Sequence, residues 1–508
     1  MDRRSLLVGA GATMFSGCVP TWSAAAAAAA AGATSLPFAG ELDDLIEEAM
    51  QRLAALAGLA VAVYSRDGVY TRGFGVTDVS TGERADANTA FYIASSTKPL
   101  TALVLSAMAV RGEIDLSATL AAFPPDAPFP PAVRADTVTF RHLLAHTSGI
   151  ACDPIAFRLA YSGQHNPDQL WRLLAASDVE AKAPLGTFNY TNTGYNIATI
   201  LTDRHFGQPW QDMLDREIFR PTGMQHATAR MSRARHGRWS IAEPHTASPD
   251  GVTKLYLEKT DQTMHSAGGA VMSANDALRW LELMIETGAV GGRQILPAAS
   301  ILATRTPIAT LNEKYAGYTR EAYGLGWYHG PYRDERMLHH FGGFPGARAH
   351  VSYIPARRIG VAAFVNDSSV AAQLTDAVAN YVYDRTAGRK DALTAFNMKI
   401  DDLIARRDRF FTRVTLERAE RAKRVWNLTR PSIDYAGSYE NENYGCIELV
   451  AEGDGLRANY GVMHASAEPY TKPDTLYVEL MPSSGDSIVF EGAGPSALRY
   501  NTDTYRRV

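Results

Sequence analysis

The stretch FYIASSTK, residues 91–98, contains a serine and a lysine three positions apart, Ser95 and Lys98. It runs into Leu100–Val110, an apolar segment typical of a buried helix. Residues three apart at the start of a helix share one face, so the hydroxyl and the amine lie within reach of each other. A serine hydroxyl becomes a useful nucleophile only when a base takes its proton, and a lysine with a lowered pKa can be that base.

The Ser-x-x-Lys spacing is not specific by itself, because chance supplies about one such pair in a chain of this length. A helix cap followed by a solvated lysine would explain it equally well. The other motifs make it specific. They are, in chain order, FYIA at 91–94, RHLLAHTSG at 141–149, FNYTNTGYN at 188–196, PTGM at 221–224, SAGG at 266–269 and HFGG at 340–343. With these motifs the chain resembles the serine β-lactamase and penicillin-binding-protein family over roughly residues 40–385, in the branch of class C β-lactamases, D-aminopeptidases, alkaline D-peptidases and β-lactamase-like esterases.

The resemblance implies an α+β fold of the β-lactamase/transpeptidase type, an antiparallel sheet flanked by helices with an inserted helical region. The residue patterns agree with this fold. They predict a helix at 41–56, strands at 59–64 and 69–76, helices near 167–176, 195–206 and 276–287, and strands at 350–354 and 359–366. We expect the stretches 225–265 and 305–322 to be loops that shape the pocket.

The roles of the site residues follow from the resemblance. Ser95 is expected to be the nucleophile, Lys98 its general base, and Tyr190 the group that passes the proton to the leaving group. Asn192 is expected to orient the substrate amide. The backbone N–H groups of Ser95 and Gly343 are expected to hold the oxyanion.

The third motif departs from the Lys-Thr-Gly of the β-lactamases, because His340 and Phe341 occupy its first two positions. An unperturbed histidine is mostly neutral at pH 7, so the binding of a substrate carboxylate is expected to be weaker. With one fixed charge fewer near Lys98, burial must do more to lower the lysine pKa. His-x-Gly is the form of D-aminopeptidases, which favours peptides and amides. Gly342 and His340 complete the expected substrate-binding set.

Two further hypotheses concern charged and metal-binding residues. Arg348 follows the third motif and could receive a substrate carboxylate, although an ordinary ion pair explains it as well. His142 and His146 have a metal-pair spacing, but no glutamate follows in the zinc-protease arrangement, so a role in organising their loop is favoured. We expect no metal and no cofactor.

The composition changes near residue 385. Between Arg385 and Arg424 there are 12 Arg and Lys against 6 Asp and Glu, and no glycine follows Gly388, which predicts a charged helix. From residue 431 short alternating segments with Gly, Asn, Asp and Pro turns predict a small all-β, barrel-like domain. The expected organisation is a signal and alanine-rich segment at 1–34, a hydrolase domain at 35–385, a helical linker at 386–430 and a β-domain at 431–508.

The N-terminus has the features of an export signal. Arg3 and Arg4 precede a weakly apolar run that is too short to span a bilayer, and an alanine run follows at 24–31. We expect a twin-arginine signal and a periplasmic or otherwise exported protein. Cleavage in the alanine run and lipidation of Cys18 remain alternatives. Elsewhere no segment is long and apolar enough to span a membrane.

The net charge of −4 gives no basic surface for nucleic acid, and three cysteines exclude a disulfide scaffold. The leading hypothesis is a serine hydrolase that forms an acyl-enzyme and cleaves peptide or amide bonds, such as those of D-residue peptides or linearised cyclic peptides. A carboxylesterase of the same fold is the alternative. A β-lactamase and a non-catalytic penicillin-binding protein rank lower. The expected partners are small peptide, amide or ester substrates.

Overall fold

The computed structural model describes residues 34–492 and 494–508. The twin-arginine signal and Cys18 therefore lie outside the described residues. Residues Ser35–Val508 form one compact unit. Within the described part of the chain, no helix has the length and hydrophobicity needed to cross a bilayer.

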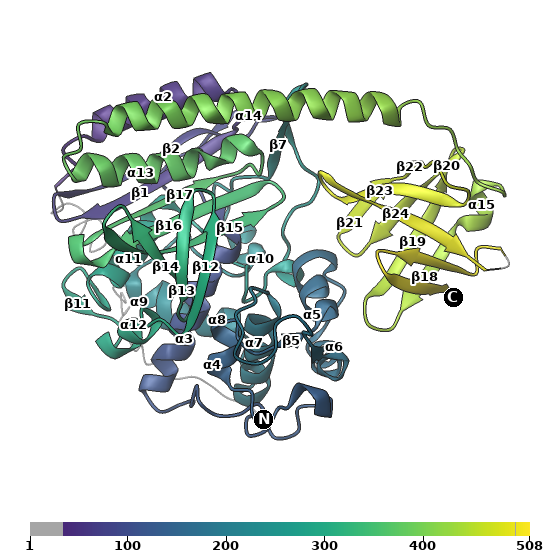
Figure 1. Cartoon of the computed structure of the whole chain (residues 1–508), viewed down its shortest axis with the longest axis horizontal. Helices are drawn as coiled ribbons and strands as arrows, with labels where there is room; N and C mark the ends of the chain where they lie inside the picture. Colours follow the sequence, from purple (N-terminus) through teal and green to yellow (C-terminus); the bar gives the residue numbers. More distant parts are fainter. Residues whose placement is uncertain (1–33, 493) are drawn as a thin grey trace, which may run out of the picture. The chain divides into compact units, whose positions relative to one another are not determined.

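A nine-stranded antiparallel sheet forms the centre of the larger part of the chain (Figure 1), in the order β12-β13-β14-β15-β16-β17-β1-β2-β3. The strands are β1 (Gly58–Ser65), β2 (Gly68–Asp78), β3 (Glu83–Arg84), β12 (Ala309–Tyr315), β13 (Tyr318–Tyr323), β14 (Tyr328–Tyr332), β15 (Glu335–Phe344), β16 (Ala347–Ile354) and β17 (Ile359–Val365). Val61 of β1 lies opposite Ala363 of β17 and Arg72 of β2. The first and last strands of this sheet along the chain, β1 and β17, thus pair with each other in its interior.

Helices cover both faces of this sheet. On one face lie α2 (Ala39–Leu53), α13 (Leu374–Thr386) and α14 (Ala392–Arg421), which run alongside one another in Figure 1; on the other lie α3 (Lys98–Val110) and α11 (Ala274–Ile285). Successive residues of β1 alternate between two cores. Val61 packs in the core under α2, α13 and α14, and Ala62 packs in the core under α3 and α11. Because both faces are covered, β1 is apolar nearly throughout.

The inserted helical region includes α4 (Phe140–Leu144), α5 (Asp153–Phe157), α6 (Pro167–Leu173) and α7 (Thr193–Phe206). Helices α4 and α7 approach each other closely at Gly194, where a Cβ atom would lie 2.4 Å from the carbonyl oxygen of Leu143. Only glycine allows this contact without a shift of the backbone. The contact holds the start of α7, and with it the Tyr190–Asn192 segment, against α4. The predicted α+β fold is confirmed.

The expectation of a loop at 305–322 is wrong, because β12 and β13 form a hairpin there. Tyr315 pairs with Tyr318 across a two-residue turn, in which Ala316 and Gly317 have φ values of 52° and 91°. Turns of this kind suit the twist of a hairpin. Strand β12 is at the edge of the sheet and carries exposed charged residues. Such charges commonly protect an edge strand from pairing with another chain. They also hide the alternation of apolar and polar residues by which a strand is recognised in a sequence.

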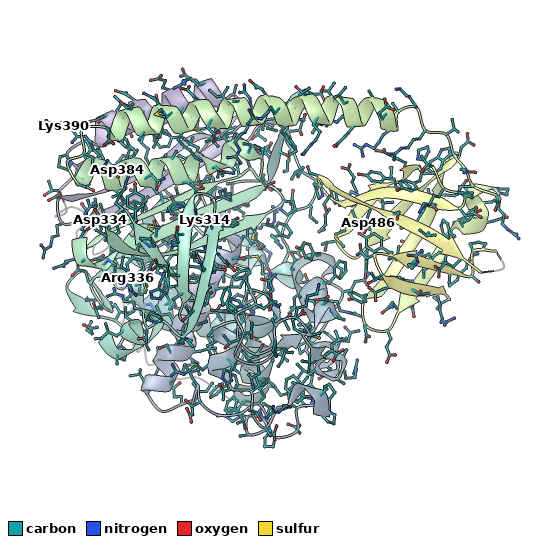
Figure 2. All side chains as sticks on the ribbon, in the orientation of Figure 1. Lys314, Asp334, Arg336, Asp384, Lys390 and Asp486 are labelled. Atoms are coloured by element: carbon teal, nitrogen blue, oxygen red, sulfur yellow. The ribbon has the colours of Figure 1, made fainter. Side chains whose placement is uncertain are left out.

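Past α13 the chain turns at Gly388, which has a φ of 71°, and enters the 30-residue helix α14. Figure 2 places Asp384 on α13 and Lys390 just before α14. The charged helix predicted from Arg385 to Arg424 thus corresponds to the last residues of α13, a turn, and α14.

The C-terminal part is a second nine-stranded antiparallel sheet, which is barrel-like and nearly closed because β21 contacts β23. Its strands are β18 (Gly437–Asn441), β19 (Gly445–Glu452), β20 (Gly455–Tyr460), β21 (Met463–Ser466), β22 (Glu468–Pro469), β23 (Thr475–Met481), β24 (Ser484–Glu491), β25 (Ala497–Tyr500) and β26 (Asp503–Arg507). The guanidinium of Arg158 donates to the carbonyl oxygens of Glu442 at 3.0 Å and Asn443 at 2.5 Å, which joins the barrel to the helical region. The predicted all-β appendage is confirmed.

Candidate active site

Ser95 lies in a single 3₁₀ turn, Ala94–Thr97, that leads directly into α3. Ala94 has a φ of 45°, an uncommon conformation for a residue with a side chain and one that is often found at functional sites. Ser95 is partly exposed, whereas Ala94 and Ser96 are buried. The hydroxyl of Ser96 donates to the carbonyl oxygen of His340 at 3.0 Å, which fixes the turn to β15. Ser95 is therefore the accessible residue of a rigid turn.

The amine of Lys98 is completely buried and lies 3.2 Å from the Oγ of Ser95. Its two other hydrogen-bond partners are acceptors, the Oδ1 of Asn192 and the carbonyl oxygen of Ala267, each at 2.8 Å. Burial lowers the pKa of Lys98 well below its ordinary value. A neutral amine has two N–H bonds and one lone pair. Donation to Asn192 and Ala267 leaves that lone pair for the hydroxyl proton of Ser95.

Tyr190 and Asn192 come from the segment that precedes α7. The ring of Tyr190 lies 4.7 Å from the Nζ of Lys98. Tyr190 is 36% exposed overall, but the desolvation of its phenol by the surrounding site raises its pKa, and its hydrogen bond to Ser95 acts in the opposite direction. The raised pKa keeps the phenol protonated at neutral pH, so Tyr190 is available as a proton donor next to Ser95.

Strand β15 brings His340 into the same site. Its Nδ1 lies 3.0 Å from the carbonyl oxygen of Phe341, which can only accept, so Nδ1 carries the proton. Burial lowers the pKa of His340 well below the usual histidine value, and the ring is neutral at pH 7. Its Nε2 has no hydrogen-bond partner among the described residues. The third motif therefore supplies a neutral acceptor where the β-lactamases carry a lysine.

The two glycines of the motif have different surroundings. A Cβ atom on Gly342 would lie 2.0 Å from the carbonyl oxygen of Ile93, so this glycine lets β15 lie directly against the segment before Ser95. Gly343 is exposed and faces open space. The pairing of β14 with β15 ends at His339. Among the described residues, no strand pairs with 340–344 on that side, and this edge is open to an extended substrate.

Arg348 lies on the other face of the sheet. It pairs with Gly343 in register, but its guanidinium donates to the Oδ2 of Asp376 on α13 at 2.7 Å. The Oδ1 of Asp376 lies 2.9 Å from the Nδ1 of His350. The structure thus separates Arg348 from the residues that surround Ser95 and uses its charge in a buried ion pair.

His146 lies next to the site, although the sequence analysis predicted only that it organises its loop. Its ring centre lies 4.6 Å from that of Tyr190, and its Nδ1 accepts a hydrogen bond from the backbone N–H of Thr191 at 3.3 Å. His142, by contrast, caps α4 through Thr139. The two histidines therefore do different things, and no group of three potential metal ligands occurs among the described residues.

Three aromatic or cationic residues near Tyr190 were not predicted: Arg320 comes from the stretch that was expected to be a loop, and Tyr323 and Tyr328 follow it at the end of β13 and the start of β14. The ring of Tyr328 stacks with Tyr190 at 6.0 Å, and that of Tyr323 lies 4.8 Å from His146. The guanidinium of Arg320 lies 3.7 Å from the ring of Tyr328 and contributes to the low pKa of His340. The alternation of Tyr318 and Arg320 with outward residues was the available sequence signal.

Comparison with known proteins identifies the family. The model of the β-lactamase family matches residues 42–383. The chain belongs to this family. It is a serine hydrolase with the β-lactamase/transpeptidase-like fold.

Several known proteins are similar to this member of the family. Unguisins hydrolase ungD of Aspergillus violaceofuscus is 26% identical over 85% of this chain and 79% of its own length. The D-alanyl-D-alanine-carboxypeptidase/endopeptidase AmpH of Escherichia coli is 22% identical over 70% of this chain and 91% of its own length. Among solved structures, the octameric penicillin-binding protein homologue from Pyrococcus abyssi has a TM-score of 0.57 at 20% identity and covers 92% of this chain and 99% of its own. The D-amino acid amidase from Ochrobactrum anthropi has a TM-score of 0.56 at 19% identity and covers 69% and 98%.

The low pKa of Lys98 predicts the pH dependence of acyl transfer. The amine is a base only when it is unprotonated, so kcat/KM for p-nitrophenyl acetate should rise with pH through the lowered pKa and reach a plateau well below the ordinary lysine value. Lys98→Arg keeps a permanent charge and should lower kcat/KM by about a thousandfold or more. The exposed Lys182 provides the matched control, Lys182→Arg, which should leave the profile unchanged. A rate limb near pH 10 in the wild type would contradict the assignment.

The position of Arg348 predicts an effect on stability rather than on substrate binding. Arg348→Leu leaves the buried Asp376 without its cation and should lower the free energy of unfolding by about 3–5 kcal/mol. Urea unfolding followed by tryptophan fluorescence measures this loss. KM for a carboxylate-bearing peptide should stay within about twofold of wild type, because the side chain does not face the cleft. A large rise in KM with an unchanged free energy of unfolding would show that Arg348 binds the substrate instead.

Proposed function

We propose that this protein is an exported serine hydrolase that cleaves peptide or amide bonds through an acyl-enzyme on Ser95. The observation that carries the proposal is the completely buried amine of Lys98, 3.2 Å from the Oγ of Ser95, with its other two contacts made to acceptors. This arrangement fits a neutral general base better than a structural ammonium. A buried structural ammonium would be paired with a carboxylate, and the described residues give Lys98 no such partner.

The first step forms the acyl-enzyme. The substrate lies along the open edge of β15, and the Oγ of Ser95 attacks its carbonyl carbon while Lys98 Nζ takes the hydroxyl proton. The negative charge on the carbonyl oxygen is held by the backbone N–H groups of Ser95 and Gly343. As the C–N bond breaks, Tyr190 passes a proton to the leaving amine and regains one from Lys98. The products of this step are the free amine and the acyl ester of Ser95.

The second step hydrolyses that ester. A water molecule attacks the acyl carbon and gives its proton to the same basic groups, and the Oγ of Ser95 leaves with a proton. The acid product and the free enzyme result. Asn192 is suited to orient the substrate amide because its Oδ1 is fixed by Lys98 at 2.8 Å.

The neutral His340 supports peptides and amides over β-lactams, since no fixed positive charge stands at the first position of the third motif. The names of relatives support a preference for D-residue or otherwise unusual peptides: they include an unguisins hydrolase, a D-alanyl-D-alanine-carboxypeptidase/endopeptidase and a D-amino acid amidase. A carboxylesterase is the second candidate, because a neutral His340 places no charge requirement on the substrate and esters need less activation.

The location of the reaction is part of the proposal. The paired Arg3 and Arg4 with the short apolar run support export as a twin-arginine substrate. Cleavage in the alanine run or lipidation of Cys18 would then decide whether the hydrolase is free or anchored.

A substrate panel tests this proposal. The purified protein is offered D- and L-amino-acid p-nitroanilides, short peptides, p-nitrophenyl esters and nitrocefin, with Ser95→Ala as the control. We expect turnover of D-residue amides or peptides and a loss of at least about a thousandfold in Ser95→Ala. Turnover of esters alone would establish the esterase. Absence of a fluorophosphonate adduct on Ser95 by mass spectrometry would refute catalysis altogether.

A further inference from the structure

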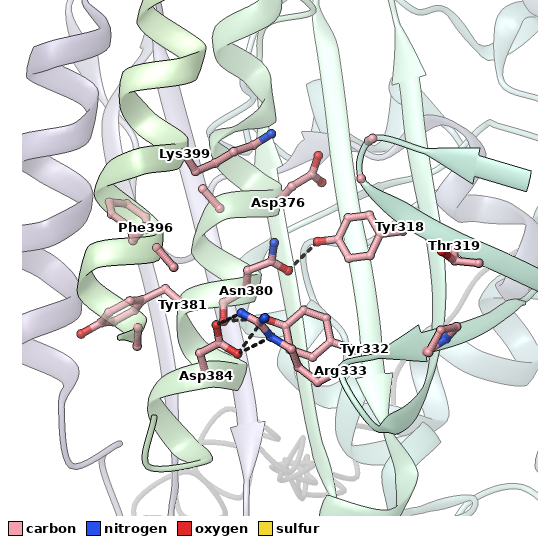
Figure 3. Close-up of a pocket in the computed structure, with 16 residues that line it drawn as sticks. Tyr318, Thr319, Tyr332, Arg333, Asp376, Asn380, Tyr381, Asp384, Phe396 and Lys399 are labelled. Carbon is pink, nitrogen blue, oxygen red and sulfur yellow. Dashed lines mark hydrogen bonds and ion pairs between the residues drawn. The ribbon is translucent and has the colours of Figure 1, made fainter. Parts of the chain in front are cut away.

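A cavity of about 370 Å³ lies on the sheet face opposite Ser95, between β13, β14 and the helices α13 and α14 (Figure 3). The two faces are separated by β15, in which successive side chains alternate. His340 contributes to the Ser95 site, whereas Phe341 belongs to the core under α13 and α14. The cavity is therefore distinct from the active site. Its volume is within the range of small-molecule sites.

Four aromatic residues line part of this cavity, beside polar and charged side chains such as Thr319, Arg333 and Lys399. Tyr318 and Tyr332 come from the sheet, and Tyr381 and Phe396 come from α13 and α14. All four side chains are buried, with exposed fractions of 2–9%. Such rings present flat apolar faces to a ligand and lose little conformational entropy when it binds, because they are already fixed.

The carboxylates of the cavity are already neutralised. Asp376 is held by Arg348 and His350, and these partners keep its pKa low although burial opposes its charge. Asp384 receives hydrogen bonds from Arg333 at 2.9 Å and from the hydroxyl of Tyr332 at 3.1 Å. Neither carboxylate is available to attract a cationic ligand.

Hydrogen-bond donors, by contrast, remain open. The Oδ1 of Asn380 accepts from the hydroxyl of Tyr318 at 2.7 Å, but its Nδ2 has no acceptor among the described residues. The ammonium of Lys399 has one carboxylate near it in the described structure, Asp402 at 4.0 Å, which is too long for a hydrogen bond. Figure 3 shows both side chains reaching from the helices toward the cavity. Two hydrogen-bond donors, the amide N–H₂ of Asn380 and the ammonium of Lys399, are thus available on the helix side of the cavity.

We propose that this cavity binds a small organic monocarboxylate with a flat apolar body. The carboxylate accepts from the Nδ2 of Asn380 and pairs with Lys399, and the body lies against Tyr318, Tyr332 and Phe396. An amine or a dication finds no unpaired carboxylate among the described residues that line the cavity, and a neutral hydrocarbon leaves both donors unsatisfied. The proposal does not depend on the proposed hydrolytic function, because none of these residues contacts Ser95 or Lys98.

Isothermal titration with 3-phenylpropionate tests the proposal, with the neutral 3-phenylpropan-1-ol as the matched ligand. We expect one site per chain for the acid and an affinity at least about tenfold lower for the alcohol. Lys399→Met, which keeps the length of a partly exposed side chain, and Asn380→Asp, which keeps the acceptor for Tyr318, should each weaken binding by at least about tenfold. Lys423→Met changes an exposed lysine elsewhere and should bind as wild type.

Two further variants separate the possible sites and exclude a folding artefact. Ser95→Ala should bind the acid as wild type does, which excludes binding in the catalytic cleft. Ala395→Phe places a ring in the cavity from the partly exposed side of α14 and should abolish binding while the far-UV circular dichroism and the rate measured with p-nitrophenyl acetate stay unchanged. Unchanged affinity in Lys399→Met and Ala395→Phe would overturn the proposal. So would the absence of binding up to about 10 mM acid.

Discussion

The site depends on the burial of the Lys98 amine without an acidic partner. A lysine in water holds its proton at neutral pH, and a lysine paired with a carboxylate holds it more strongly. Here the hydrogen-bond partners of the amine among the described residues are a hydroxyl, an amide oxygen and a backbone carbonyl, and the rings of Tyr190 and Tyr195 lie near it. Burial removes the solvation of the charged form and so lowers the pKa of Lys98 well below its ordinary value. In the proposed mechanism, Ser95 becomes reactive because of where the fold places this lysine.

The rest of the fold maintains this environment. Helix α3 is buried along most of its length, which holds Lys98 away from water. Gly342 lets β15 press against the chain before Ser95, and Gly194 lets α7 bring Asn192 alongside the amine. The two glycines act at positions where any side chain would push a catalytic segment away. Packing between segments distant in sequence is therefore what sets the chemistry of the base.

Strand β15 divides the protein into two chemical environments. One set of alternate residues, with His340, completes the site around Ser95. The other set, with Phe341, covers a core in which Arg348, His350 and Asp376 form a buried ionic group. Because side chains alternate along a strand, the guanidinium of Arg348 lies away from the cleft, and the neutral His340 faces it. This difference in charge, more than the identity of the nucleophile, is what we expect to separate this protein from the β-lactamases in substrate preference.

The sequence alone determined the family, the fold class, the motifs that supply Ser95, Lys98, Tyr190 and His340, and the β-appendage, because these depend on local spacing and on periodicity. It could not show that 305–322 is a hairpin, since the charges of an edge strand mask its alternation. It also could not decide where Arg348 points or that His146 lies beside Tyr190, because strand register and contacts between distant segments set those positions. Only the tertiary structure supplied the physical cause of the lowered pKa of Lys98, its complete burial, since a pKa depends on burial and on neighbours that are far away in the chain.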